Sequence, residues 1–381
     1  MNRRDSAMLH YPRRASVRRR RTLWSRIHID PWLGGLLLVL LGAGLIVLYS
    51  ASGQRMPVVT AQASRFGIAL VAMATLAQIS PKTLCRWSPV VYAMGLAMLV
   101  AVEVMGDIGM GAQRWLEIPG LIRFQPSELM KLAMPMMVAA YLQRQVLPPR
   151  LRDIAVCAMI MAVPVAMIAR QPDLGTSLLV SSAGLFVLLL AGLSWRLIGC
   201  LVALAGAALP LLWINMLDYQ RQRVLTFLNP ESDPLGSGWN IIQSTTAIGS
   251  GGLIGKGWTL GTQSQLEFLP ERKTDFIVAV LGEEFGLVGM LLILTLYLLI
   301  VGRGLLMANG AHDSYGRLVA GSIILTFFIY VFVNIGMVSG ILPIVGVPLP
   351  LVSYGGTSSV TLMAGFGILM SIHSHRRLLP R

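Results

Sequence analysis

Apolar runs long enough to cross a membrane recur along this chain of 381 residues, and they constrain its fold more than any other feature. Each run spans roughly 18 residues or more, a length that as a helix matches a hydrocarbon core of about 30 Å. Only 13% of the residues are charged, whereas a soluble domain carries about a quarter. These features exclude a soluble enzyme and a disordered chain, and they predict a polytopic membrane protein.

Ten such runs are bounded by charges, glycine and proline, and each is expected to be an α-helix because a bilayer tolerates no lipid-facing sheet edge. The predicted fold is therefore an all-α integral membrane protein of about ten transmembrane helices, with a large extracytoplasmic loop between the seventh and the eighth. The predicted spans cover residues 33–51, 62–79, 88–106, 127–145, 152–169, 173–191, 195–214, 275–303, 316–342 and 349–374.

The distribution of lysine and arginine orients these spans. With the N-terminus in the cytoplasm, the inside segments hold nine arginines before residue 27 and eleven basic residues further on, which is 20 of the 31 in the chain. Only four of the 17 acidic residues fall inside. The positive-inside rule therefore predicts that both termini are cytoplasmic. We expect a basic tail over residues 1–31, a membrane domain over 32–377 and a short tail over 378–381.

The net charge of +14 has the same origin, because the excess lies in the N-terminal tail and the short inside loops. This distribution fits membrane topology and contact with anionic membrane lipids. It does not indicate a nucleic-acid partner.

One external loop is far longer than the others and covers residues 215–274. It contains tryptophan and phenylalanine among glycine and charged residues, a composition that differs from that of a disordered segment. Long loops in compact proteins are usually functional or disordered. We therefore expect short interfacial helices and turns folded over the outer mouth, with the working end facing the periplasm.

The densest polar cluster lies at the start of the eighth span and ends in Asp275. Thr274 is a candidate N-cap, which would place Asp275 in the first helical turn. The helix dipole and the neighbouring Arg272 would then favour the ionised carboxylate. A solvated helix start explains the same pattern, but an acid where polar loop meets membrane favours a role in a site.

Two adjacent acids, Glu283 and Glu284, lie about two helical turns further into the same span. Carboxylates inside a span are costly and suggest function. On one continuous helix Glu284 would point away from Asp275, at 100° per residue. The pair is therefore expected to support the site from behind or to bind neighbouring helices.

A second polar cluster surrounds the outer end of the fourth span. A proline fits the first helical position there, which puts Glu128 and Lys131 at i and i+3. A helix-stabilising ion pair is one interpretation, and an anion site is the other, because basic side chains beside a helix N-terminus suit a diphosphate. Arg114 and Arg123 flank this cluster, and Trp115 would either stack on a sugar or anchor at the interface.

Two glycine-rich segments add further candidates. Residues 249–257 depart from the phosphate-loop pattern and leave a flexible turn with Lys256 as a candidate phosphate contact. Residues 346–358 interrupt the last span around Ser353 and Tyr354, and such backbone at membrane depth is tolerated only where it is buried or lines a polar cavity. The last two spans are expected to help line such a cavity, with Ser353 and Tyr354 supporting the site from behind.

Four long motifs resemble the SEDS family, and the likeness extends over residues 30–377. They are NPESDPLGSGWNIIQSTTAIGSGGLIGKGW, LEFLPERKTDFIVAVLGEE, RFQPSELMKLA and VNIGMVSGILPIVGVPLPLVSYGG. The combination of FLPERKTDFI with NIGMVSGILPIVGVPLP resembles the elongation branch of the family more than the division paralogue FtsW.

The resemblance implies a peptidoglycan glycosyltransferase that polymerises lipid II into glycan at the outer face of the bacterial inner membrane. It implies that Asp275 is the essential acid and that Trp115, Glu128 and Lys131 are functionally sensitive. It also implies a class B penicillin-binding protein as partner, a transpeptidase that cross-links the glycan, together with other elongasome membrane proteins.

An inverting transfer of this kind needs a base for the acceptor hydroxyl and cations for the departing diphosphate. Asp275 is the candidate base. A divalent cation, Mg or Mn, held by Asp275 is a further expectation, although no ligand spacing in the sequence proves it. The candidate cationic side chains are Arg114, Arg123, Lys131, Lys256 and Arg272.

Two other functions stay open at this point. A lipid II flippase would need an acid–base path through the spans, for which Glu103, Glu283 and Glu284 are candidates. A scaffold that only binds the transpeptidase would need no acid at the outer end.

Overall fold

The computed structural model describes residues 28–109, 112–118, 122–216, 218–233, 237–266, 269 and 271–375. Ten of its helices coincide with the ten predicted spans. Six of them are long and apolar enough to cross a membrane by length and composition alone. The predicted class, a helical multi-pass membrane protein, is confirmed.

These helices begin mostly where the sequence supplies a cap or a proline. The side chains of Asp30, Ser80 and Asp173 each accept a hydrogen bond from a backbone N–H of the turn that follows. The ten helices are α2 (Pro31–Ala51), α3 (Met56–Gln78), α4 (Pro81–Met105), α5 (Pro126–Leu142), α6 (Leu151–Arg170), α7 (Leu174–Leu190), α8 (Trp195–Asn215), α12 (Ile277–Asn309), α13 (Ser314–Val338) and α14 (Thr357–Ser374).

The last predicted span is wrong at its start. It was expected from residue 349, whereas α14 begins at Thr357. Residues 349–356 form turns instead, because two prolines and two glycines in and just before them do not support a regular helix. This segment runs over the outer end of the bundle and forms part of the site described below.

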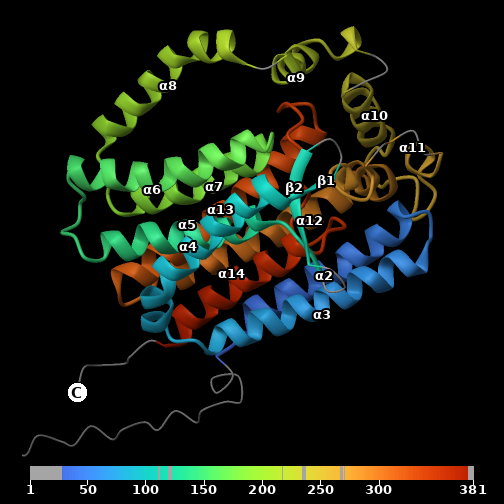
Figure 1. Cartoon of the computed structure of the whole chain (residues 1–381). Coiled ribbons are helices and arrows are strands. Elements are labelled where there is room, and N and C mark those ends of the chain that lie inside the picture. Colours follow the sequence, from blue (N-terminus) through green and yellow to red (C-terminus); the bar gives the residue numbers. More distant parts are fainter. Residues whose placement is uncertain are drawn as a thin grey trace, which may run out of the picture.

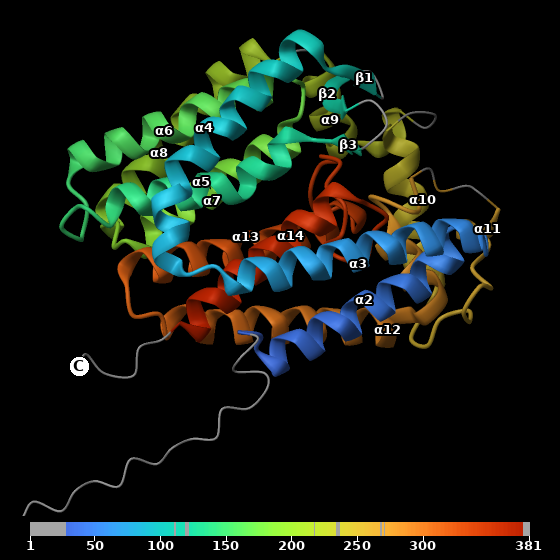
Figure 2. The ribbon, with the colours of Figure 1, turned by 60° about the horizontal axis from the view of Figure 1, so that its bottom comes forward.

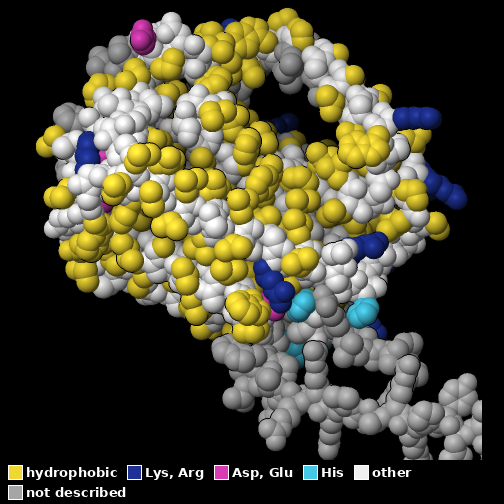
Figure 3. Space-filling model, turned by 180° about the vertical axis from the view of Figure 1, so that it is seen from behind, with side chains coloured by type: hydrophobic (Ala, Val, Ile, Leu, Met, Phe, Trp, Pro, Cys, Tyr) yellow, Lys and Arg dark blue, Asp and Glu magenta, His cyan; other side chains and the backbone are white. Residues whose placement is uncertain are grey.

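The helices form an elongated bundle with α13 near its centre (Figures 1 and 2). α13 packs against α5, α7, α12 and α14, and α14 packs in turn against α3. Side chains of this central group form the core, with Phe327 of α13 in contact with Tyr297 of α12 and Phe366 of α14. The exposed flank of the molecule is largely hydrophobic (Figure 3), as a lipid-facing surface requires.

Both ends of the described chain lie at one end of the bundle. The rings of His28 and His375 stack at a centroid distance of 4.5 Å. Beside them, Arg303 of α12 forms two hydrogen bonds with Asp30, at 2.5 and 3.2 Å. Burial opposes the charged form of Asp30, but these bonds and the Leu33 N–H outweigh it and lower the pKa of Asp30 below its ordinary value. The even number of predicted spans agrees with this placement.

The opposite end carries the external segments (Figure 1). Three short antiparallel strands, β1 (Asp107–Gly109), β2 (Ala112–Ile118) and β3 (Ile122–Phe124), precede α5; the sequence analysis had not predicted them. The long loop after α8 contains short helices, as predicted. They are α9 (Asp218–Leu228), the 3-10 turn η1 (Pro230–Ser232), α10 (Ser237–Ser250) and α11 (Thr262–Gln265).

α8 differs from the other long helices in its packing. It arches away from the bundle in Figure 1, and the opening below the arch is visible in Figure 3. Within the part of the chain that the structure describes, only residues of its first turns, such as Leu197 and Ile198, meet the core. Further along, described side chains such as Leu204 and Ile214 are exposed.

Candidate active site

Asp275 precedes α12 instead of lying in its first turn. The helix starts at Ile277 with Phe276 as its N-cap, so the predicted N-cap role of Thr274 is wrong. The carbonyl groups of residues 273–275 do not enter the helical ladder because donors from other segments occupy them.

Each of these three consecutive carbonyls accepts a hydrogen bond from a different donor. In chain order, the donors are the Tyr354 backbone N–H at 2.8 Å, the Ser353 hydroxyl at 2.5 Å and the Asn334 side-chain amide at 2.9 Å. The predicted residues Ser353 and Tyr354 therefore lie directly against the turn that carries Asp275. Their contacts run through the backbone and fix the position of this turn.

The Asp275 side chain is half-buried and lies beside Gly346. A Cβ built on Gly346 would be 3.4 Å from Asp275 Oδ2. Gly346 has φ +70°, a left-handed conformation that favours glycine. The carboxylate thus borders bare backbone, and a side chain at position 346 would crowd it.

The segment around Ser353 is itself anchored from two helices. The Tyr297 hydroxyl of α12 donates to the Pro350 carbonyl at 2.6 Å. Gln62 of α3 exchanges two hydrogen bonds with the backbone of Gly355, at 3.2 and 3.3 Å. The candidate active site therefore rests on rigid elements, which is what a precisely placed carboxylate needs.

Arg65 of α3 also belongs to this region, and the sequence analysis missed it. Its guanidinium carbon lies 4.5 Å from the centre of the Tyr354 ring, a cation–π contact. The signal was present, since Arg65 is a charged residue inside the apolar run predicted as span 62–79.

Lys131 lies in a buried cluster between α5 and α13. Its Nζ is 2.6 Å from Glu128 Oε1 and also donates to the hydroxyl of Tyr330. Both charged side chains are only 7% exposed. The ion pair predicted from the i, i+3 spacing is confirmed, whereas Tyr330 was not foreseen.

A small cavity of about 30 Å³ adjoins this ion pair, enough for one water molecule. It is lined by Glu128, Lys131, Thr326 and Thr361 among apolar neighbours. Glu128 Oε2 and Thr326 Oγ1 are buried without a hydrogen-bond partner among the described residues. Two such oxygens are suitable partners for a buried water.

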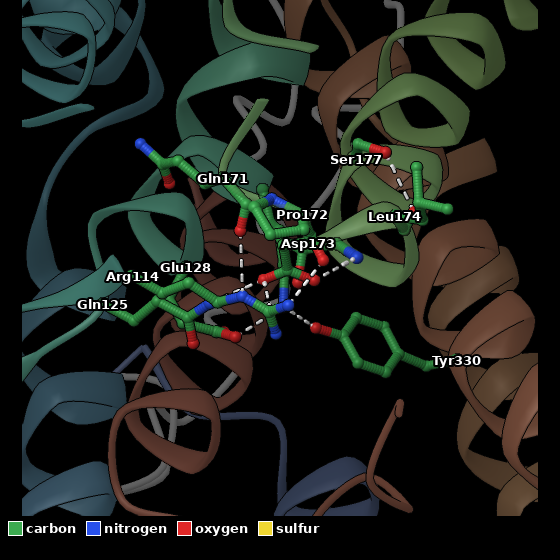
Figure 4. A network of polar contacts seen from close by, with 11 residues as sticks. Arg114, Gln125, Glu128, Gln171, Pro172, Asp173, Leu174, Ser177 and Tyr330 are labelled. Carbon is green, nitrogen blue, oxygen red and sulfur yellow. Dashed lines mark hydrogen bonds and ion pairs between the residues drawn. The ribbon is translucent and has the colours of Figure 1, made fainter. Parts of the chain in front are cut away.

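Arg114 extends from β2 to the N-terminus of α7, not to that of α5 (Figure 4). It donates to the carbonyls of Gln171 at 3.0 Å and Pro172 at 2.5 Å, and one terminal nitrogen lies 4.0 Å from Asp173 Oδ2. Gln125, the N-cap of α5, donates to the same Asp173 oxygen at 2.9 Å. Asp173 therefore links the starts of α5 and α7 to the strand that carries Trp115.

α13 connects the Lys131 cluster to Asp275. Tyr330 and Asn334 are four residues apart and so lie on the same face, about one helical turn from each other. Tyr330 packs against Val347, and the Val347 carbonyl accepts a second hydrogen bond from Asn334 at 2.7 Å. The structure thus brings the two predicted polar clusters to one helix.

Glu283 holds the glycine-rich segment to α12. Its Oε1 accepts hydrogen bonds from Lys256 Nζ at 2.7 Å and from the Gln263 N–H at 2.8 Å. Glu283 is fully buried, so loss of Lys256 would leave an uncompensated buried charge. Lys256, a candidate phosphate contact in the sequence analysis, is here a structural partner of Glu283.

Glu284 points to a different neighbour, the Ser50 hydroxyl of α2. The helix breaks two residues later, at Gly286, where φ is +63°. The prediction from 100° per residue does not apply, because Asp275 lies outside α12. Both acids nevertheless support the walls of the outer end.

The remaining candidates lie around this centre. Arg272 is buried, and a guanidinium nitrogen is 3.7 Å from the position of a Cβ on Gly53, in the turn between α2 and α3. Trp115 pairs with Asp107 across β1 and β2. Arg123 is in β3, and its side chain lies outside the described residues.

The geometry has no preformed metal cage in the described ranges, where no group of three or more His, Cys, Asp or Glu side chains is arranged to hold an ion. Asp275 would bring one carboxylate to a cation. Mg²⁺ is commonly held by one or two carboxylates together with substrate phosphates, so the arrangement fits an ion shared with a diphosphate.

Residues 32–378 match the family described as cell cycle protein, which comprises FtsW, RodA and SpoVE. The chain belongs to this family. Within the FtsW/RodA/SpoVE family it is 54% identical to the peptidoglycan glycosyltransferase MrdB of Escherichia coli K12, over 95% of this chain and 98% of that protein. It is 38% identical to the probable peptidoglycan glycosyltransferase FtsW of Geobacter metallireducens, over 75% and 76% of the two chains.

Solved structures of family members share the fold. A chain of a peptidoglycan synthase complex that coordinates polymerization and crosslinking superposes with a TM-score of 0.81 at 31% identity, over 92% of this chain and 98% of that chain. The crystal structure of the rod shape determining protein RodA of Thermus thermophilus gives a TM-score of 0.69 at 29% identity, over 90% and 96%.

Proposed function

We propose that this chain is a peptidoglycan glycosyltransferase that polymerises lipid II into β-1,4 glycan strands during cell elongation. The greater similarity to MrdB than to FtsW supports the elongation branch. One structural observation carries the chemistry: Asp275 is held through three consecutive carbonyls, at the end of the bundle where the external segments meet the spans. A group that must accept a proton at a fixed place needs such support.

In the proposed reaction, the acceptor's 4-hydroxyl oxygen attacks the anomeric carbon of the donor. The bond from that carbon to the diphosphate oxygen breaks with inversion, and its electron pair leaves with undecaprenyl diphosphate. The hydroxyl proton passes to the Asp275 carboxylate as the new bond forms. A positioned general base contributes about 10²–10⁴ in rate.

The departing diphosphate requires positive charge, which is most effective where water is excluded. We assign this role first to Arg65 and Arg272, because the segments that carry or contact them adjoin Asp275. Lys131 would act from the α5 side with Glu128 as its orienting partner, and Arg114 from the N-terminus of α7. A divalent cation between Asp275 and the diphosphate would supply further charge neutralisation.

The chain is a multi-pass membrane protein, and we propose that it lies in the bacterial inner membrane with both termini cytoplasmic. The division of basic residues supports this orientation, as does the location of α9–α11 at the end opposite to the described chain ends. Asp275 would then face the periplasm, where lipid II and the nascent glycan are found. The surrounding membrane lipids would contact the apolar flank.

We also propose a class B penicillin-binding protein as partner, because the structural relative at 31% identity belongs to a complex that coordinates polymerization with crosslinking. Other elongasome membrane proteins would assemble with the pair. The transport alternative is less well supported, since Glu283 and Glu284 bind Lys256 and Ser50 at the outer end and so have structural partners there.

Polymerisation of purified lipid II by the purified chain, alone and with the penicillin-binding partner, tests the proposal. Wild type should give glycan strands, and Asp275→Asn should reduce the rate about 10²–10⁴-fold while it inserts and binds its partner normally. Ser322→Ala, which removes a buried hydroxyl from α13, is the control for general damage. The assay is repeated with a chelator and then with Mg²⁺ or Mn²⁺ added back. A rate that falls with the chelator and returns with the ion supports Asp275 as an ion ligand, and an unchanged rate supports it as a base without an ion.

Two results would contradict the proposal. Near wild-type glycan synthesis by Asp275→Asn would remove both the base and the ion-ligand role of this residue. Movement of labelled lipid II across vesicles by wild type, without polymerisation, would favour the flippase.

A further inference from the structure

Asn334 is an amide buried in the middle of the bundle, and nothing in its own helix requires it. Its side chain is 0% exposed on α13, a helix of otherwise largely apolar character. Burial of an amide is costly unless its hydrogen bonds are made. The side-chain nitrogen of Asn334 donates two hydrogen bonds, to the carbonyl of Asp275 at 2.9 Å and to that of Val347 at 2.7 Å.

The orientation of this amide is fixed by its partners. Both neighbours are carbonyl oxygens, which only accept, so the NH₂ group and not the oxygen must face them. The two carbonyls come from segments that are 59 and 13 residues away along the chain. One side chain on a packed helix therefore determines where two separate segments meet.

Those two segments are the two sides of the candidate active site. One carries Asp275, and the other carries Gly346, which lies beside the Asp275 carboxylate and immediately precedes Val347. Ser353 and Tyr354 also hold the Asp275 turn, but they belong to the loop itself. Of these three donors, Asn334 is the one that comes from a long helix in the centre of the bundle. It therefore fixes the positions of the Asp275 segment and the Gly346 segment relative to α13.

We propose that Asn334 is a positioning residue for Asp275: by binding the carbonyls of Asp275 and Val347, it fixes the distance between the Asp275 carboxylate and the Gly346 backbone. This inference rests on the proposed function. We call the two hydrogen bonds of Asn334 the clamp. Its loss would leave the fold in place and move the Asp275 carboxylate. A displacement of about 1 Å can lower the rate about 10²-fold.

Three variants of Asn334 test the clamp. Asn334→Leu keeps the size and removes both donors. Asn334→Asp also keeps the size, removes the donors and adds a carboxylate close to Asp275. Asn334→Ser is smaller and keeps a hydroxyl, so that a folded variant is obtained if Leu is not accepted.

Steady-state polymerisation of lipid II by the full chain measures the effect. Asn334→Leu is expected to lower kcat about 10²-fold with little change in KM, because the carboxylate moves but the substrate contacts stay. Asn334→Asp is expected to lower kcat at least as far, because its carboxylate would face two carbonyl oxygens that need donors.

The matched control is Ser322→Ala, on the same helix. Ser322 is also 0% exposed and donates to a carbonyl of another helix, that of Ala183, at 2.7 Å. This variant should keep kcat and KM. It loses a comparable interhelical hydrogen bond without touching the site.

The inference is overturned if Asn334→Leu and Asn334→Ser keep wild-type kcat, if Asn334→Asp keeps it, or if none of the three variants folds. It is also overturned if Ser322→Ala loses as much activity as Asn334→Leu. A failure of the proposed function gives a different result, because wild type would then make no glycan at all.

Discussion

The outer end of α12–α14 and the arch of α8 are built in opposite ways. Around Asp275, hydrogen bonds from three segments fix consecutive backbone groups. Beyond the first turns of α8, described side chains such as Leu204 are exposed. The same contrast separates spans of similar hydropathy, since 67% of the α13 window is buried but only 17% of that of α6.

This difference shows what carries packing information in a membrane protein. Apolar side chains are about equally favourable in lipid and in a protein core, so hydrophobicity does not determine which helices pack against each other. Glycine and polar side chains do, because they permit close backbone approach or require a partner. The region of the site is rich in both, and the arch is poor in polar residues.

The largest effect is expected at Gly286, where the glycine-rich segment meets α12. Its φ of +63° and ψ of −161° are reached almost only by glycine, and a Cβ there would lie 2.4 Å from the Gly255 nitrogen. Gly286→Ala should therefore cost more than about 4 kcal/mol and give little folded protein, as measured by thermal unfolding in detergent.

Gly302→Ala is the matched control for that change, on the same helix. A Cβ at Gly302 meets nothing within 4 Å. Within a helix this substitution should stabilise by about 0.5–1 kcal/mol. Equal stability of the two variants would contradict the tight assembly described for this end of α12.

An intermediate effect is expected for the buried pair of Lys131 and Glu128. Lys131→Met leaves Glu128 as an uncompensated buried charge, which typically costs about 3–5 kcal/mol. Adding Glu128→Gln removes that charge and should restore most of the stability in the same thermal assay. Lipid II turnover by the double variant then decides the function of the pair.

The two outcomes of that assay differ clearly. If turnover stays low while stability returns, Lys131 has a role toward the diphosphate. If turnover returns with stability, the pair is a structural ion pair that joins α5 to α13 through Tyr330.

The sequence was sufficient for what depends on local pattern. Each of the ten predicted spans contains a helix, although the last one begins at Thr357 and not at residue 349, and i, i+3 spacing predicted the pair of Glu128 and Lys131. The sequence also placed Asp275 correctly at the junction of the external loop and the eighth span. It placed the residue wrongly in the first helical turn, which begins only at Ile277.

What the sequence could not supply is long-range. Asn334 and Asp275 are 59 residues apart, and Ser353 is 79 residues from Thr274, so no spacing signals these bonds. The same holds for Tyr330 and Lys131, which are 199 residues apart. β1 and β3 were missed because three residues have too little pattern to identify, and β2, with seven residues, lacks a regular alternation of apolar and polar side chains.

The smallest effect is expected on the arch, and it tests the comparison most directly. Leu204 of α8 is 65% exposed, whereas Leu369 of α14 is 0% exposed. Leu369→Ala should cost about 2–5 kcal/mol because it leaves a cavity in a packed core. Leu204→Ala leaves none and should stay within about 0.5 kcal/mol of wild type. Thermal unfolding of both variants in one detergent measures the difference. A cost at Leu204 as large as that at Leu369 would mean that α8 packs against the bundle in solution, and the contrast between the two regions would then disappear.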